Sequence, residues 1–298
     1  MARMPDGPPP PPTAQKLRIR YAKRGRLRFT SHRDIQRAFE RALRRARVPM
    51  AYSAGFTPHP KVSWAGAAPT GVASEAEYVE IGVTRVLDPA ELAAALDGSL
   101  PPDLDILEVV AAATPNLMER LEASVWEIRL PGVAPEEAAA AVAAFLAAGE
   151  VPVERMTKNG VRTFDARSAV VGISALADTT GVADGKGAVG QDDAPGDAPG
   201  DGVSAGQGIG GRGDGHVERP CAILRLVVRH LTPAVRPDDV LTGLGRVAGL
   251  VPPVPPQVTR LAQGPLRDGF EVTASVSVEA LSDPLDPDRA AAGPTTER

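Results

Sequence analysis

The stretch from residue 16 to residue 47 most constrains the fold, because its hydrophobic pattern changes from one type of element to another. In its first half apolar and basic residues alternate, which predicts two strands separated by a turn at Gly25. In its second half apolar residues recur at helical spacing, ahead of Pro49. Ser31 and Asp34 resemble a capping box at the start of this helix. We therefore expect a strand pair followed directly by an amphipathic helix.

The same stretch carries a strongly segregated positive charge. Thirteen of its thirty-two residues are Lys or Arg and only Asp34 and Glu40 oppose them, which gives +11 in a chain of formal net charge -4. One side of the predicted helix carries Arg33, Arg37, Arg41 and Arg44. Such a charge distribution indicates a polyanionic or acidic partner, and an arginine-rich solvated face is the alternative.

Cysteine usage and the lack of long apolar runs exclude several classes of protein. The single cysteine, Cys221, excludes a disulfide within the chain and an iron–sulfur cluster held by several of its own cysteines. No apolar run approaches the roughly 20 residues of a membrane span, and the N-terminus has no apolar signal core. We expect a cytoplasmic protein with no membrane partner, no metal and no cofactor of its own.

The length of 298 residues leaves room for two domains at about 150 residues each. Residues 178–217 hold 13 Gly and 7 Asp and no Leu, Phe, Tyr or Trp, so they cannot bury enough apolar surface to offset their ordering entropy. We expect them to be a disordered insertion. The remaining boundaries are a disordered Pro-rich tail over 1–15, a basic domain over 16–115, a second domain over 116–281 and a disordered tail over 282–298.

Periodicity in the first block predicts strand, helix, strand pair, helix and strand. After the helix that follows Ser31, strands are expected at 50–53, 62–65 and 76–83, a helix from 88 or 89 to 96, and a strand at 104–110. This order is the split βαβ pattern of a ferredoxin-like fold.

The second block repeats this pattern more loosely. We expect a strand at 121–130, a helix at 135–148, a hairpin of 151–156 and 161–165, a strand at 222–229, a helix at 237–247 and a strand at 270–278. The predicted fold class is α+β, with tandem ferredoxin-like (split βαβ) domains and the Gly/Asp-rich insertion in the second.

Polar residues of the first block gather where elements begin or end, which is where a scaffold presents functional groups. The helix start at Ser31, with its free N–H groups and His32, is suited to holding a phosphate. Basic residues of the first strand and turn are expected to add phosphate contacts: Lys16, Arg18, Arg20 and Arg24. The predicted binding residues are Ser31, His32, Arg37, Arg41, Arg44, Ser53, Gly55, Phe56, His59, Lys61 and Ser74.

His32 and His59 are the only histidines of the first block. If they approach each other they are suited to acid–base catalysis or to binding a metal, with Asp34 or Glu77 supplying a carboxylate. The alternative is structural, with Asp34 capping the helix, His59 bracing its Pro-flanked loop and Glu77 pairing with an arginine.

Residues 27–80 resemble a radical SAM-associated (radical SAM-linked) family of uncharacterised proteins. The resemblance covers about residues 16–175 and continues weakly into 219–245. Its matching positions are Ser31, His32, Asp34, Arg37, Arg41, Ser53, Gly55, Phe56, Pro58, His59, Pro60, Ser63, Gly71, Ser74 and Glu77. Members are fused behind a radical SAM protein with a cobalamin-binding-like region or are encoded near one. The resemblance implies a separately encoded radical SAM protein as a partner, and RNA or ribosome-linked machinery as a further one.

The radical SAM core itself is absent, because its C-x₃-C-x₂-C motif needs three cysteines and the chain has one. We therefore expect a non-catalytic accessory module that recognises RNA or a ribonucleoprotein through its Arg-rich face. The alternatives are an RNA-cleaving or RNA-modifying enzyme that uses His32 and His59, and a protein-binding adaptor.

Overall fold

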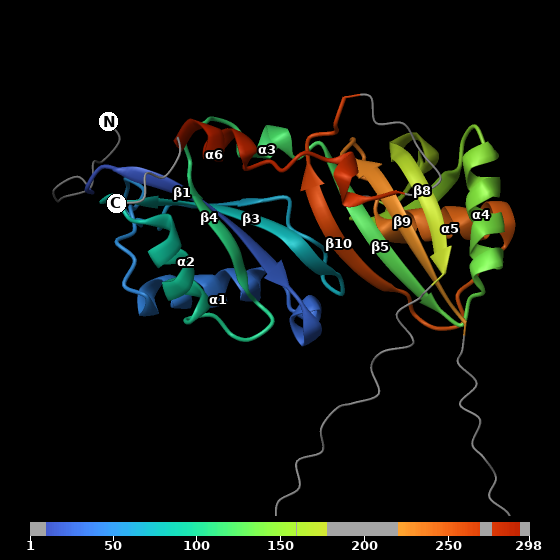
Figure 1. Ribbon diagram of the computed structural model, residues 1–298, viewed down its shortest axis with the longest axis horizontal. Helices are drawn as coiled ribbons and strands as arrows, with labels where there is room; N and C mark the ends of the chain where they lie inside the picture. Colours follow the sequence, from blue (N-terminus) through green and yellow to red (C-terminus); the bar gives the residue numbers. More distant parts are fainter. Residues whose placement is uncertain (1–9, 159, 178–219, 269–275, 293–298) are drawn as a thin grey trace, which may run out of the picture.

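The computed structural model describes residues 10–158, 160–177, 220–268 and 276–292. They form an α+β molecule around one mostly antiparallel sheet (Figure 1). The main path of this sheet is β4-β1-β3-β10-β5-β9-β8, and β2 pairs with β3 beside it. Its strands are β1 (Gln15–Lys23), β2 (Val62–Ala65), β3 (Ala73–Val83), β4 (Ile106–Ala111), β5 (Ala123–Pro131), β8 (Val170–Ala177), β9 (Cys221–Arg229) and β10 (Gln257–Gly264).

The helices of the described residues lie on both faces of this sheet (Figure 1). They are α1 (His32–Arg45), α2 (Pro89–Asp97), α3 (Leu117–Arg120), α4 (Pro135–Ala147), α5 (Pro237–Ala248) and α6 (Asp286–Ala292). Three short 3-10 turns are η1 (Gly25–Phe29), η2 (Arg167–Ala169) and η4 (Val278–Ala280). None of the helices in the described ranges is long and apolar enough to cross a membrane.

In the first half, α1 and α2 pack on one face of the sheet, and α3 and α6 lie on the other (Figure 1). The helix-covered core includes the alternate strand residues Leu17 and Ile19 with Phe39 of α1. Leu117 of α3 and Leu285, just before α6, pack on the opposite face. Because side chains of a strand alternate between faces, both faces of β1 and β3 are buried.

The second half has its core between the sheet and the pair α4 and α5. Phe145 of α4 and Leu244 of α5 pack there against strand residues such as Leu224. Residues 276–281 cover part of the other face through Val276 and Leu281. The strands β6 (Pro152–Thr157) and β7 (Gly160–Asp165) form a separate hairpin.

The two halves show the same strand order. In the first it is β4-β1-β3-β2 and in the second β10-β5-β9-β8, and all neighbours within each half are antiparallel. One strand joins the halves: β3 pairs with β2 through Tyr78–Ile81 and with β10 through Ala73 and Ser74. The β3–β10 pairing is parallel and only two residue pairs long, so main-chain hydrogen bonds contribute little to this junction.

Most predicted elements agree with the structure, and the differences have local causes. The helices α1, α2, α4 and α5, the strand β2 and the β6–β7 hairpin are confirmed. The strand expected to resume at residues 27–29 is wrong, because Gly25 adopts a φ of 48° and the chain enters η1. The strand expected at 50–53 consists only of isolated bridges at Met50 and Tyr52. The sequence patterns do not predict the strands β8 and β10.

The predicted tails also differ from what the structure describes. Residue Gln15 belongs to β1, and the N–H of Ala14 donates to the carbonyl of Val83 at 2.8 Å. The tail predicted over 282–298 contains α6, which packs on the first half. The predicted insertion and most of the strand expected at 270–278 lie outside the described residues.

Candidate functional site

Helix α1 presents the most basic face of the first half. Ser31 caps it, accepting from the N–H of Asp34 at 3.2 Å and donating to the Asp34 carboxylate at 2.7 Å. The hydrogen bond from Ser31, with help from Arg37, lowers the pKa of Asp34. Ile35 and Phe39 are buried on the sheet side. The opposite side, called here the basic face, is exposed and carries Arg33, Arg37, Arg41 and Arg44.

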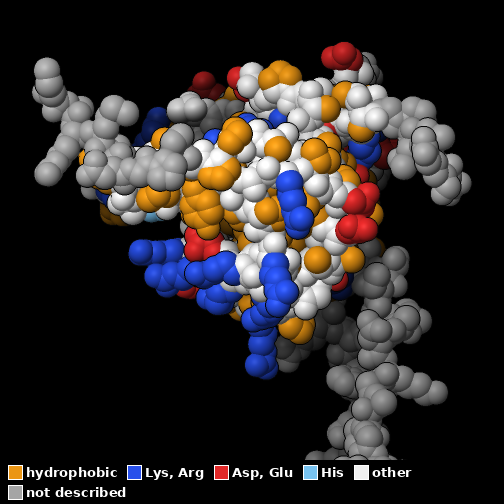
Figure 2. Space-filling view, turned by 90° about the vertical axis from the view of Figure 1, so that its left-hand side faces the viewer, with side chains coloured by type: hydrophobic (Ala, Val, Ile, Leu, Met, Phe, Trp, Pro, Cys, Tyr) orange, Lys and Arg blue, Asp and Glu red, His pale blue; other side chains and the backbone are white. Residues whose placement is uncertain are grey.

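The basic face has few acidic partners. Arg37 forms an exposed ion pair with Asp34 at 3.3 Å, and Arg44 donates to the carbonyl of Glu40. Arg33 and Arg41 form no ion pair with any residue that the structure describes. Figure 2 shows Lys and Arg side chains gathered on the lower part of the end of the molecule where α1 lies.

The basic residues of β1 and the following turn are instead paired within the molecule. Lys16 and Arg18 both donate to Glu80, which faces Arg18 across the β1–β3 ladder. Arg20 lies 3.6 Å from Asp283, and Arg24 pairs with Glu75 and Asp105. These four side chains, predicted to contact phosphates, thus each have an acidic partner within the protein.

A buried carboxylate from α6 completes this pairing. Asp288 is fully buried and accepts from Arg18, from Arg120 at 3.0 Å and from the Thr114 hydroxyl at 2.6 Å. The two arginines donate to Oδ2, whereas the Thr114 hydroxyl shares Oδ1 with the backbone N–H groups of Ala113 and Thr114, which donate to it at 3.0 and 2.9 Å. Burial alone raises the pKa of Asp288, but the hydrogen bonds from Thr114, Arg18 and Arg120 outweigh it and lower the pKa.

His32 lies at the start of α1 against the edge strand β2. Its ring meets Trp64 edge-on at a centroid distance of 5.3 Å, and its Nε2 lies 3.0 Å from the side-chain nitrogen of Gln36. Burial lowers the pKa of His32. The positive charge of Lys23 also lowers it, whereas the negative charge of Glu77 raises it. His32 is thus a partly buried, packed imidazole.

The loop before β2 gathers several predicted binding residues around a small pocket. The backbone N–H of His59 donates to the Ser53 hydroxyl at 3.0 Å, and the Ser53 N–H donates to the His59 carbonyl at 2.8 Å. Gly55 allows the turn, with a φ of 132°. The pocket has a volume of about 220 Å³, and its lining includes Ser53, His59, Lys61, Lys16, Ser63 and Glu80.

The structure does not bring His32 and His59 together. His32 packs against Trp64, whereas His59 lines the pocket beside Lys16 and Glu80. Trp64 belongs to the core that α1 covers, and Lys16 and Glu80 belong to the opposite face of β1 and β3. Asp34 instead caps α1. Three or more His, Cys, Asp or Glu side chains suited to a metal ion do not gather anywhere among the described residues.

Ser74 and Glu77 lie where β3 changes partner from β2 to β10, a place called here the seam. Glu77 forms a buried ion pair with Arg260 of β10, whose Nε donates to the Ser74 hydroxyl at 3.2 Å. Arg260 and Gln263 also donate to the carbonyl of Gly66, which follows the end of β2. The seam therefore fills the gap in the ladder with side-chain hydrogen bonds.

The seam also changes the proton affinity of its neighbours. Burial lowers the pKa of Lys23. The negative charge of Glu77 opposes this effect, and the positive charge of Arg260 lowers the pKa further. Burial and the charge of Glu77 raise the pKa of Tyr21, and the charge of Arg260 partly offsets this increase. Lys23 donates to the carbonyl of Pro69 at 3.2 Å, so its ammonium is solvated by the backbone rather than by water. Sequence reasoning missed Arg260, because a buried arginine looks like any exposed one until its partner is known.

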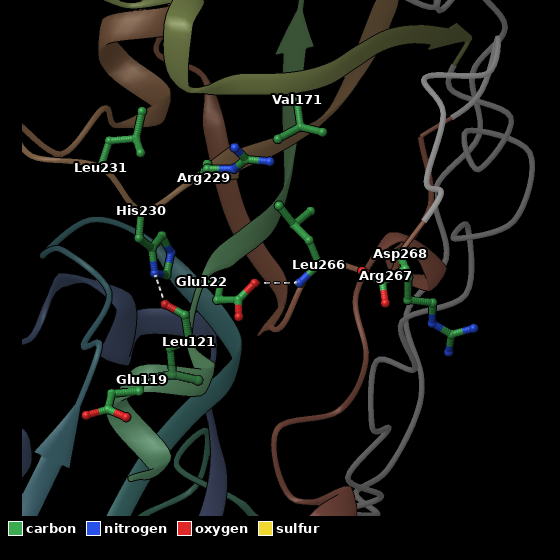
Figure 3. A pocket seen from close by; sticks show the side chains of 10 residues that line it. All are labelled: Glu119, Leu121, Glu122, Val171, Arg229, His230, Leu231, Leu266, Arg267 and Asp268. Carbon is green, nitrogen blue, oxygen red and sulfur yellow. Dashed lines mark hydrogen bonds between the residues drawn. The ribbon is translucent and has the colours of Figure 1, made fainter.

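A larger cavity of about 700 Å³ lies around His230, between Glu119 of α3 and residues of the second half (Figure 3). The His230 Nδ1 donates to the carbonyl of Leu121 at 2.6 Å, and its Nε2 lies 2.7 Å from the hydroxyl of the buried Ser124. Burial lowers its pKa, and the bond to Leu121 opposes this. The lining also holds Glu119, Glu122, Asp268, Arg229 and Arg267. These charges nearly balance, so the cavity favours neither an anion nor a cation.

A family model described as an uncharacterized protein conserved in bacteria (DUF2344) matches residues 16–237. The chain belongs to the DUF2344 family. The match spans the first half and the second as far as the start of α5, so in this DUF2344 chain β10 and α6 lie outside it. No curated protein matches the chain.

Proposed function

We propose that this DUF2344 chain is a non-catalytic accessory module that binds RNA through the basic face of α1. The observation that carries the proposal is the contrast between two sets of basic side chains. Those of β1 are neutralised by Glu80 and Asp288, whereas Arg33 and Arg41 lack an ion pair among the described residues. A face left uncompensated in this way is suited to a polyanion.

The partner in this proposal is a separately encoded radical SAM protein. The resemblance of residues 27–80 to the radical SAM-associated family supports it. The accessory role follows because one cysteine cannot hold the cluster of a radical SAM core. The separate surroundings of His32 and His59 also weigh against an enzyme that uses them as a pair.

We also propose that each half is a ferredoxin-like unit. The support is the repeated strand order β4-β1-β3-β2 and β10-β5-β9-β8, with a helix following the first and the third strand of each set in chain order. This assignment concerns the fold alone, because the same fold hosts many functions.

The test measures RNA affinity as a function of salt concentration. Arg37→Ala with Arg41→Ala should weaken binding to all RNA sequences and flatten the log–log salt slope by about 0.7 to 0.9 for each phosphate that is no longer neutralised. Lys158→Ala with Arg162→Ala is the matched control, because it removes the same charge from exposed positions on the β6–β7 hairpin. Fluorescence anisotropy with labelled RNA gives both quantities.

Two results would contradict the proposal. One is equal binding by the wild type and the α1 double variant at low salt. The other is an equal loss of affinity in the hairpin control, which would mean that net charge and not the basic face determines binding. Capture of an acidic protein by the same face, with no RNA bound, would favour the adaptor alternative.

A further inference from the structure

We propose that Phe29 is a stacking platform for an unpaired base, so that the RNA bound by the basic face is single-stranded. This inference rests on the proposed function and narrows its substrate class. It starts from an aromatic side chain that is exposed rather than buried in a core. Phe29 ends η1, three residues before α1 begins, and it is 62% exposed.

The backbone around Phe29 is held on both sides. The N–H of Gly71 donates to the carbonyl of Arg28 at 2.6 Å, and the N–H of Thr30 donates to the carbonyl of Leu27 at 3.0 Å. Leu27 packs against the core of the first half. Phe29 is therefore presented by a fixed turn, and a base that stacks on it meets a surface that is already ordered.

The ring has one face covered by a cation and the rest open. The guanidinium carbon of Arg28 lies 4.7 Å from the centroid of the Phe29 ring. An arginine in this position orients the ring and attracts a phosphate, while the exposed area leaves room for a base. Stacking on an aromatic ring is the common way in which proteins hold unpaired bases without reading their sequence.

The charges around Phe29 fit a nucleic-acid strand. Arg26, Arg28 and Arg33 form no ion pair with any residue in the described ranges. Arg33 is also the first member of the basic face, which runs along α1 to Arg44 for about 17 Å at 1.5 Å per residue. A strand whose base stacks on Phe29 therefore has its phosphates directed along the basic face.

A second exposed phenylalanine follows α1 in the sequence. Phe56, in the loop before β2, is 68% exposed. Surfaces that bind single strands combine backbone charge contacts with base stacking. A duplex offers its phosphates to the arginines but keeps its bases paired, so only a single strand uses both kinds of contact.

The test compares variants at Phe29 on two probes, an unstructured single-stranded oligoribonucleotide of mixed A and C and the same strand in a perfect duplex. Phe29→Ala should weaken single-strand binding by about 5- to 100-fold, the effect of removing one stacked base, and leave duplex binding unchanged. Phe29→Leu should behave like Phe29→Ala, because it keeps an apolar side chain without a flat ring. Phe29→Trp should keep the wild-type affinity.

The outcomes separate this inference from the proposed function. Unchanged single-strand affinity in Phe29→Ala, equal weakening on both probes, or wild-type binding by Phe29→Leu would each overturn the stacking role. In those cases the Arg37→Ala, Arg41→Ala variant should still bind RNA weakly and the proposed function would stand. If the wild type binds neither probe, the proposed function fails first. Because Phe29 is exposed, unchanged melting temperatures provide the folding control.

Discussion

At the scale of single residues, Asp288 is a fully buried carboxylate that accepts five hydrogen bonds. Its carboxylate accepts from two arginines and from two successive residues that follow β4. Arg18 is only 2% exposed, so without this carboxylate its charge is left buried beside Glu80 alone. A charge buried in this way and stripped of a partner is strongly destabilising.

We predict that Asp288→Asn lowers the free energy of unfolding by about 3 kcal/mol, because it removes the negative charge and one acceptor oxygen. Urea denaturation measures this decrease. Asp286→Asn is the control, since Asp286 pairs with Arg289 in an exposed position where an ion pair contributes less than about 1 kcal/mol. Equal stability of both variants would show that Asp288 is dispensable.

The pH dependence of the same carboxylate has a definite sign. Its pKa is lowered in the folded chain, so the folded state binds the proton less tightly than the unfolded state. The stability it gives is complete above the ordinary carboxyl pKa of about 3.9 and is lost as the pH falls below that value. Below pH 4 the wild type should therefore lose its advantage over Asp288→Asn.

At the scale of elements, β8 and β9 are adjacent antiparallel strands of the sheet. Ala177, the last residue of β8, faces Ala222 near the start of β9. Such a pair needs only a short turn between its strands. We predict that replacing residues 178–219 with a turn of about four residues shifts the melting temperature by less than about 4 °C. A calorimetric scan checks this, and a larger drop would mean that the replaced segment contributes to folding.

Local signals explain which elements the sequence predicts. Ser31 and Asp34 define the start of α1 because a cap depends on residues three positions apart. The strand prediction at 27–29 is wrong because a short alternation fits both a strand and a turn, and the left-handed backbone at Gly25 decides between them. The strand β10 escapes prediction because its Arg260 is buried through a partner 183 residues away.

In the candidate site too, features that depend on local sequence are predictable, and features that depend on distant partners are not. Exposure of the α1 arginines follows from helical spacing alone, so their position is predictable. The neutralisation of Arg18 is not, because it depends on Glu80 from another strand and on Asp288 from a distant helix. The charge pattern of a sequence thus indicates where positive charge is concentrated, but not which of the basic side chains are neutralised by partners in the folded protein.

At the scale of the whole molecule, the seam is where two halves become one sheet. Glu77 and Arg260 are both nearly fully buried, and Trp126 lies 5.5 Å from the Arg260 guanidinium. The two tryptophans of the chain report on different halves, Trp64 on the first and Trp126 on the second. Their fluorescence can therefore follow the unfolding of each half separately.

We predict that Glu77→Gln separates the two unfolding transitions and lowers total stability by about 3 kcal/mol, because Arg260 keeps its charge without a buried counterion. Denaturation of the Trp64→Phe and Trp126→Phe backgrounds gives the two transitions. Glu75→Gln, which weakens a half-exposed pair with Arg24, is the matched control. Coincident transitions with an unchanged midpoint would mean that the halves are coupled by other contacts.

The position of β10 and α6 late in the sequence affects the order of events during translation. Domains generally fold as the chain leaves the ribosome, with the N-terminal part first. Arg18 of the first half has two counterions. Glu80 is synthesised soon after it, but Asp288 follows more than 200 residues later. Until then Arg18, which is buried in the complete chain, lacks one of its two counterions, and Ala73 and Ser74 of β3 lack their partner strand β10. During translation the first half therefore has a more positive net charge and a lower stability than the same residues have in the complete protein.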